Sequence, residues 1–158
     1  MPMLKVAVVG MRPIGLQHAD CHVASPQAQL VAVCDIDQAL ADAAGAKYGA
    51  TAYYDLDRML GEESLDIVDV CTGGEEKGGA HFVPVMAAIA AGKHVLCEKP
   101  ISNDIGQARE MVAAARQAGV CFGVNLNYRF TPLCRLAKSW LDQGRLGEVN
   151  FINKTLWI

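Results

Sequence analysis

The sequence lacks several features that would place it in other classes of protein. Its 158 residues contain no basic cluster and carry a net charge of −3, which argues against nucleic-acid binding. No apolar run reaches the roughly 18 residues that a membrane helix needs. The N-terminus enters a strand-like run directly, without a signal-peptide pattern. Repeats, low-complexity tracts and linkers are also missing, while 52% of the residues are apolar. We therefore expect a globular protein with a packed core.

The six cysteines form no C-x-x-C pair. Four of them lie in apolar, strand-like runs, where they are expected to act as small buried hydrophobic residues: Cys34, Cys71, Cys97 and Cys121. Cysteines used in this way are typical of a reducing compartment. We accordingly expect a cytoplasmic protein.

Apolar runs alternate with helical patterns along most of the chain. The expected strands are Leu4–Val9, Leu30–Cys34, Thr51–Tyr54, Ile67–Cys71, Val95–Cys97 and Val120–Leu126. The expected helices are Ile14–Ala24, Asp37–Tyr48, Leu56–Leu60, Ala80–Ala91, Asp104–Ala118 and Pro132–Gln143, with Ser102 or Asn103 as the N-cap of the fifth. Continuous apolar strands that alternate with helices predict an α/β fold, a doubly wound parallel sheet covered on both faces.

The end of the chain is unusual for a complete domain. Residues Glu148–Ile158 are expected to begin another strand, and they end in apolar, β-prone residues that would leave an unpaired edge. We expect a dinucleotide-binding domain at 1–127, followed at 128–158 by a connecting helix and the start of a second α/β domain that continues beyond this chain. The alternative is that the last residues fold back onto the sheet.

The first expected strand runs into a glycine pattern that resembles a phosphate-binding turn. It reads Val9-Gly10-Met11-Arg12-Pro13-Ile14-Gly15 and stands between a strand and a helix, where G-x-G-x-x-G is found in dinucleotide-binding folds. Gly10 would make the tight turn, Gly15 the close helix–strand contact, and the helix N-terminus would receive pyrophosphate. Arg12 replaces the second glycine. It either binds phosphate through its guanidinium, which we favour, or obstructs the site.

An acidic residue follows the second expected strand. Asp35 lies 20 residues after Gly15, at the spacing of the carboxylate that binds an adenosine ribose, with Ile36 beside it. A carboxylate accepts from both ribose hydroxyls and repels a 2′-phosphate, so this position favours NAD over NADP. The alternative is a simple cap at the end of the strand.

A third feature is the run His94-Val95-Leu96-Cys97-Glu98-Lys99-Pro100. An apolar strand ends abruptly in an acid, a base and a proline, at the edge of the sheet where ligands bind in parallel α/β folds. Proline limits the backbone of this turn, so the lysine leaves the strand in a defined direction. The alternative is a charged turn without a ligand.

These three features in this order resemble the glucose–fructose oxidoreductase / inositol dehydrogenase / MocA family. The phrase Ala90–Pro100 is specific to that family, and Arg129–Pro132 and Gly144–Glu148 look like its passage into a second domain. The resemblance implies an NAD(P)-binding Rossmann domain followed by a mixed α/β domain, and oxidation or reduction of sugars, inositols and related carbonyl compounds.

The resemblance also implies roles for individual residues. Lys99 would contact the reacting hydroxyl and the nicotinamide ribose and assist proton transfer, while Glu98 would hold the nicotinamide side. The peptide before Pro100 is often cis in this family. His81 would match a histidine that opens a helix, and Asn127 and Arg129 would lie at the mouth of the site. The residues assigned to the cofactor are Gly10, Met11, Arg12, Pro13, Ile14, Gly15, Asp35, Ile36, Cys71, Thr72, Gly73, His81, Glu98, Lys99, Asn127 and Arg129.

The chain departs from the family in the glycine-rich loop at 73–79 and in lacking the second domain, to which the family's catalytic histidine belongs. From these 158 residues alone we expect cofactor binding without turnover. No metal site is expected: His18 and His22 stand four apart on one helix, but without an indicated third ligand they are interpreted as a structural or surface pair.

The leading hypothesis is an NAD-dependent oxidoreductase whose partner is a small sugar or polyol, with no nucleic-acid or membrane partner. The alternative is a non-enzymatic module on the same fold that senses nucleotide or binds a partner. A third, weaker hypothesis is a fragment that forms a homo-oligomer through its exposed last strand.

Overall fold

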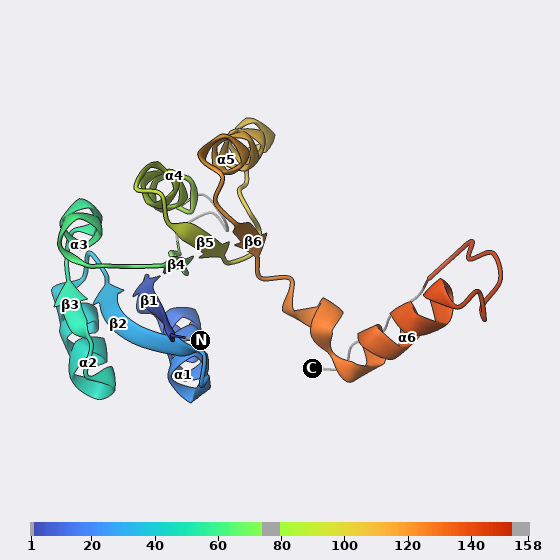
Figure 1. Ribbon diagram of the computed structural model, residues 1–158, viewed down its shortest axis with the longest axis horizontal. Coiled ribbons are helices and arrows are strands. Elements are labelled where there is room, and N and C mark those ends of the chain that lie inside the picture. The colour runs from blue at the N-terminus through green and yellow to red at the C-terminus, as the bar shows by residue number, and fades with distance from the viewer. Residues whose placement is uncertain (1, 74–79, 153–158) are drawn as a thin grey trace. The chain divides into compact units, whose positions relative to one another are not determined.

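The structure is a computed structural model that describes residues 2–73 and 80–152. The chain divides into two compact units, Met1–Asn125 and Leu126–Ile158. The first unit is built on a six-stranded sheet in which neighbouring strands pair in parallel, with helices on both faces (Figure 1). The predicted α/β class with a doubly wound parallel sheet is confirmed. The domain boundary predicted between residues 127 and 128 stays a prediction.

The strands follow the predicted apolar runs, but the last is shorter than the predicted Val120–Leu126. They are β1 (Leu4–Val9), β2 (Ala28–Cys34), β3 (Thr51–Tyr53), β4 (Ile67–Val70), β5 (His94–Cys97) and β6 (Phe122–Val124). Their order across the sheet is β3-β2-β1-β4-β5-β6, so the direction of winding reverses between β1 and β4. In an open parallel sheet a crevice for ligands forms at that reversal, beyond the carboxyl ends of the strands.

The helices pack two separate apolar layers against the sheet. The first unit contains α1 (Pro13–Ala24), α2 (Gln38–Tyr48), α3 (Leu56–Glu62), α4 (Phe82–Ala90) and α5 (Ile105–Ala118). Ala19 of α1 and Ala44 of α2 belong to one buried cluster, while Met59, Val85 and Met111 of α3, α4 and α5 belong to the other. Figure 1 shows α1 and α2 on one face and α4 and α5 on the opposite face.

Short polar side chains define where these helices begin. Asp37 accepts from the backbone N–H of Ala39 at 3.0 Å, and Asp104 accepts from that of Gln107 at 2.8 Å. Each such bond satisfies a backbone donor that the first helical turn leaves open. The prediction of Ser102 or Asn103 as the cap of α5 was wrong by one or two residues, because the Asp104 carboxylate reaches the third helical N–H.

Burial of the cysteines follows the predicted pattern in three cases. Cys34, Cys71 and Cys97 are buried, but Cys121 is exposed. The prediction for Cys121 was wrong because this residue precedes β6, which is an edge strand and is covered on one flank only. The backbone N–H of Cys121 donates to Nδ1 of His94, so that histidine has a structural role.

The second unit contains the 3₁₀ turn η1 (Asn127–Phe130) and the helix α6 (Pro132–Asp142). The predicted helix Pro132–Gln143 is confirmed to within one residue. The expected strand over Glu148–Ile158 is not formed by residues 148–152, because a strand is stable only when it pairs with another; the rest of that prediction lies outside the described residues. Among the described residues, no helix has the length and apolar character to cross a membrane.

Candidate functional site

The turn after β1 cannot accept a side chain at either of its glycines. Gly10 has φ of +93°, and a Cβ placed there would lie 2.8 Å from the backbone of Cys71 and Thr72. A Cβ on Gly15 would lie 1.8 Å from the carbonyl oxygen of Gly10. The predicted tight turn at Gly10 and close helix–strand contact at Gly15 are confirmed, because only glycine fits such approaches.

Arg12 occupies the N-cap position of α1 with ordinary extended backbone angles, φ −72° and ψ 178°. Its side chain is exposed and makes no capping hydrogen bond, and Pro13 begins the helix behind it. The guanidinium is therefore available at a helix N-terminus, where both backbone dipole and side chain favour an anion. Ile14, at the next position, is 43% exposed.

Asp35 braces the same turn from the end of β2. Its Oδ2 accepts from the backbone N–H of Met11 at 2.6 Å, and its Oδ1 accepts from that of Asp37 at 2.9 Å. The Met11 side chain is buried in the core, while Ile36 is 94% exposed at the rim. The carboxylate is thus both a local cap, as the alternative interpretation held, and a fixed acceptor whose remaining lone pairs are free for a ligand.

A cleft of about 700 Å³ opens between these groups. Its walls include Gly10, Arg12, Asp35, Thr72, Gly73 and Val83. This volume lies within the range of pockets that hold small ligands and cofactors, about 300–1,000 Å³. The structure therefore brings the glycine turn, the Asp35 carboxylate and the residues after β4 around one cavity; residues 74–79 of the predicted loop lie outside the described residues.

The segment after β5 is held by a buried histidine. His81, 3% exposed at the N-cap of α4, donates through Nδ1 to the carbonyl oxygen of Pro100 at 2.8 Å. The Lys99–Pro100 peptide is cis, as the family resemblance implied. Thr72 donates through Oγ1 to the carbonyl oxygen of Ala80 at 2.7 Å, which ties the end of β4 to the start of α4.

Glu98 and Lys99 differ sharply in environment. The Glu98 side chain is 9% exposed, whereas the Lys99 side chain is 56% exposed. Lys99 Nζ lies 4.0 Å from Glu98 Oε2, and the backbone N–H of Lys99 donates to the same oxygen at 3.2 Å. A buried carboxylate therefore anchors the base of a lysine whose ammonium group faces solvent.

A cluster of ionisable side chains lies behind this pair, and the sequence did not reveal it. Asp69 of β4 is fully buried, and its Oδ2 accepts from His18 Nδ1 at 2.9 Å and from His22 Nε2 at 2.7 Å. A carboxylate only accepts, so both ring nitrogens carry hydrogen. The one sequence signal for Asp69 is a charged residue inside the apolar run of β4, a rare position for an unpaired carboxylate.

The cluster shifts the ionisation of its members. The hydrogen bond to Asp69 raises the pKa of His18 above its usual value, and the Asp69 and Glu98 charges act in the same direction. Burial raises the pKa of Asp69, but the hydrogen bonds from His18 and His22 outweigh burial and lower it. Burial raises the pKa of the Cys71 thiol far above its usual range, and this thiol donates to Asp69 Oδ1 at 3.6 Å.

Asn125 connects the cluster to Glu98. Its Nδ2 donates to Glu98 Oε1 at 2.5 Å and lies 3.1 Å from His18 Nε2, which is itself 3.2 Å from Glu98 Oε1. Side chains from α1, β4 and the ends of β5 and β6 thus meet at the carboxyl edge of the sheet. No sequence signal marks Asn125, since its partners are distant in the chain.

Two predicted site residues belong to the second unit. Asn127 and Arg129 lie in η1, and the Arg129 guanidinium is 5.6 Å from the centre of the Phe130 ring. Their predicted place at the mouth of the site stays a prediction.

Comparison with known proteins agrees with this geometry. Residues 4–126 match the model of the GFO_IDH_MocA family, described as an oxidoreductase family with an NAD-binding Rossmann fold. The chain belongs to this family. The predicted family and its NAD-binding Rossmann fold are therefore confirmed, and the non-enzymatic alternative has no support from the relatives below.

Named relatives include the D-glucoside 3-dehydrogenase of Escherichia coli (strain K12), 33% identical over 92% of this chain and 41% of that protein. The inositol 2-dehydrogenase of Rhizobium meliloti (strain 1021) is 29% identical over 96% of this chain and 44% of that protein. A scyllo-inositol dehydrogenase structure from Lactobacillus casei, with bound NAD(H) and scyllo-inositol, superposes with a TM-score of 0.85, at 29% identity, over 92% of this chain and 43% of that one. The chain spans less than half the length of these relatives.

Proposed function

We propose that this chain is the NAD(H)-binding part of a dehydrogenase that acts on a sugar- or polyol-like alcohol. The observation that carries the proposal is the Asp35 carboxylate, fixed by two backbone N–H groups at the wall of a 700 Å³ cleft. Each carboxylate oxygen retains a lone pair for a ribose hydroxyl. The same charge repels a 2′-phosphate, which supports NAD rather than NADP.

The residues present fit a dinucleotide. The Gly10–Gly15 turn leaves room that a Cβ would fill, so backbone N–H groups at the start of α1 can approach a pyrophosphate. The exposed Arg12 guanidinium supplies a positive charge at the same helix end. When bound, NAD supplies the acceptor for a hydride from the substrate carbon.

Lys99 is proposed to bind the reacting oxygen and to help its proton leave. Two hydrogen bonds fix the backbone that carries its exposed ammonium group. The Lys99 N–H donates to the Glu98 carboxylate, and His81 donates to the Pro100 carbonyl oxygen. Such positioned proton transfer contributes about 10²–10⁴-fold to rate. In a form of the protein that turns over substrate, Lys99→Met should therefore lower kcat at least about 10²-fold. The matched control is Lys93→Met, because Lys93 precedes β5 and lies at the opposite edge of the sheet.

Calorimetric titration of NADH and NADPH into the purified chain tests nucleotide binding. We expect NADH to bind more tightly than NADPH, and Asp35→Ala to weaken NADH binding about 10-fold or more, as loss of a charge-assisted hydrogen bond predicts. The control is Asp57→Ala, an exposed carboxylate on α3 outside the cleft. Equal binding of both nucleotides, or no effect of Asp35→Ala, would contradict the proposal.

The role of Arg12 is separated by Arg12→Ala in the same titration. If the guanidinium binds phosphate, the variant should bind NADH about 10-fold more weakly. If the side chain obstructs the cleft, the variant should bind NADH more tightly, and Arg12→Gly more tightly still.

We also propose a cytoplasmic location. The free thiols of Cys21, Cys34, Cys71, Cys97 and Cys121 support it, because a reducing compartment preserves them. Fractionation of cells that express a tagged form would test it, and recovery in an oxidising compartment would contradict it.

A further inference from the structure

Two pairs of metal-ligating side chains face one another between α1 and β4. His18 and His22 are four residues apart on α1, and Asp69 and Cys71 are two residues apart at the end of β4. The periods of helix and strand place each pair on one face of its element. The sequence indicated no third ligand for these histidines, whereas the fold brings two candidates, Asp69 and Cys71, close to His18.

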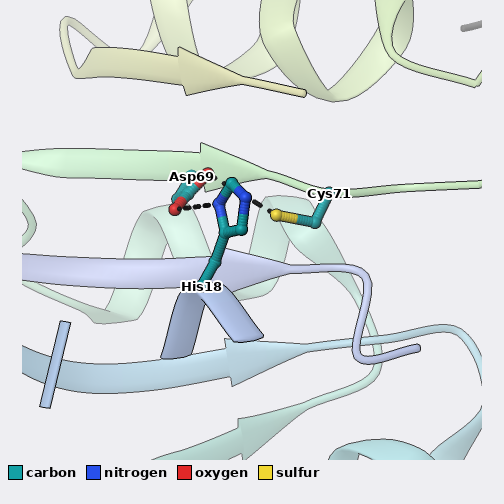
Figure 2. Close-up of side chains that lie close together, drawn as sticks. All are labelled: His18, Asp69 and Cys71. Carbon is teal, nitrogen blue, oxygen red and sulfur yellow. Dashed lines mark hydrogen bonds and ion pairs between the residues drawn. The ribbon is translucent and has the colours of Figure 1, made fainter. Parts of the chain in front are cut away.

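The donor atoms lie close enough to share one ion. Figure 2 shows the side chains of His18, Asp69 and Cys71 turned toward one another, and one ligand atom from each of these residues lies within 4.8 Å of the others. His18 Nδ1 is 2.9 Å from Asp69 Oδ2, and Cys71 Sγ is 3.6 Å from Asp69 Oδ1. Tetrahedral zinc with ordinary bond lengths needs ligand atoms about 3.3–3.6 Å apart. Shifts of the ligand atoms by about 1 Å would bring them to these separations.

The groups that orient metal ligands in proteins are already in place. If Nδ1 of His18 faces an ion, its Nε2–H faces Glu98 Oε1 at 3.2 Å, which is the arrangement of a carboxylate–histidine–metal triad. His22 Nε2 holds Asp69 Oδ2 at 2.7 Å, and Asn125 holds the Glu98 carboxylate. His18 and Asp69 therefore each have a second contact that fixes the direction of the side chain.

We propose that His18, Asp69 and Cys71 form a binding site for one divalent cation of the zinc type. One imidazole nitrogen, one carboxylate and one thiolate are ligands that Zn²⁺ and Co²⁺ accept together in tetrahedral sites. The carboxylate and thiolate charges balance the two charges of the ion. On binding, the Cys71 thiol proton and the proton on His18 Nδ1 pass to solvent, and the His18 ring keeps its hydrogen on Nε2. His18 and His22 side chains are 13% and 18% exposed, which leaves a route from solvent.

The Cys71 thiol contributes little to this network as a hydrogen-bond donor. Asp69 is already satisfied by two imidazoles, so the thiol at 3.6 Å adds only a weak bond. The fourth position is open to water or to His22, whose ring already lies against Asp69. The site ties helix α1 to the central strand β4, so a bound ion would stabilise the first unit.

Titration of Co²⁺ into the purified, chelator-treated chain tests the proposal. We expect a near-ultraviolet thiolate-to-cobalt absorption band together with the visible bands of a tetrahedral ion, saturating at one ion per chain. Cys71→Ser should abolish the thiolate band and weaken binding at least about 10-fold. The matched control is Cys21→Ser, an exposed thiol beside His22 on α1, which should behave as the wild type.

A second readout uses Zn²⁺ and thermal unfolding. The ion should raise the Tm of the wild type and of Cys21→Ser, because it binds the folded state, and should not raise that of Cys71→Ser. Circular dichroism of each metal-free variant checks that it folds. Absence of a thiolate band in the wild type, or its loss in Cys21→Ser with retention in Cys71→Ser, would overturn the proposal. Neither readout requires nucleotide, so the metal site can be tested even if the chain does not bind NADH.

Discussion

The two halves of the sheet's carboxyl edge are built in different ways. After β1 and β2, the geometry is set by the backbone: two glycines that admit no Cβ, and a carboxylate held by two N–H groups. After β4, β5 and β6, it is set by side chains, with Asp69, His18 and Glu98 joined through hydrogen bonds. We expect substitutions that add a side chain to destabilise the first half. We expect substitutions that remove a charge or a hydrogen bond to destabilise the second.

The largest effect is expected at the backbone-built half. Gly15→Ala places a methyl group where only 1.8 Å separates it from the Gly10 carbonyl oxygen. Relief requires the helix to move, so we expect the free energy of unfolding in urea to fall by more than about 3 kcal/mol. Gly61→Ala in α3 is the control, since a Cβ there meets open space and a helical Gly→Ala change should be neutral or stabilising. Similar losses of unfolding free energy in Gly15→Ala and Gly61→Ala would contradict the special role of Gly15.

The next effect is expected at the side-chain-built half. Asp69→Asn keeps the shape but removes the charge that two imidazoles share, and its amide N–H₂ can accept from neither. Breaking such a buried pair costs about 3 kcal/mol or somewhat less where one bond survives. Urea unfolding measures the loss, and Asp57→Asn on the exposed face of α3 is the control. An unchanged stability would show that the cluster contributes nothing to the fold.

Alkaline pH tests both halves through their buried thiols. Burial, and then the nearby Asp35 or Glu98 carboxylate, raises the pKa of Cys34 and of Cys97 from 9.0 to about 12. The protonated thiols therefore stabilise the fold fully below pH 9.0, and this stability is lost as the pH rises toward about 12. Each thiol contributes a slope of up to about 1.4 kcal/mol per pH unit in that window.

Cys97→Ala and Cys34→Ala should each make the free energy of unfolding less dependent on pH over that window. Guanidinium unfolding at a series of alkaline pH values measures the slope, with Cys121→Ala at an exposed position as the control. A slope that neither buried substitution reduces would mean that other groups govern alkaline unfolding.

The smallest effects on stability are expected at the helix N-caps, a feature that both halves share. Asp37 caps α2 beside the glycine turn, and Asp104 caps α5 beyond the Glu98 segment. Replacing either with alanine should lower the free energy of unfolding by about 1 kcal/mol, the usual cost of losing such a cap. Thermal unfolding compares the two, with Asp37→Ser and Asp104→Ser as partial rescues. Markedly unequal losses would show that one cap also supports its neighbouring site.

The sequence predicted the backbone-built half well. The strand Leu4–Val9 and the roles of Gly10 and Gly15 rest on local pattern, and the spacing from Gly15 to Asp35 lies within one βαβ unit, where the acid is expected about 20 residues after the glycines. The side-chain-built half escaped prediction. His18 and Asp69 lie 51 residues apart, and His18 and Asn125 lie 107 apart, so no local spacing records their contact.

Two errors have the same origin. Cys121 is exposed, and residues 148–152 form no strand, although both segments have the composition of buried strands. Composition indicates what a segment can form, but position at a sheet edge and the presence of a pairing partner decide burial and pairing.

The sequence by itself determined the parallel α/β fold, the glycine turn, Asp35 and the Glu98-Lys99-Pro100 segment, because each depends on residues that are neighbours or one βαβ unit apart. Only the tertiary structure decided that His18, His22, Asp69, Cys71, Glu98 and Asn125 meet at one place. That meeting depends on which face each helix and strand presents to the next, which sheet order and packing determine.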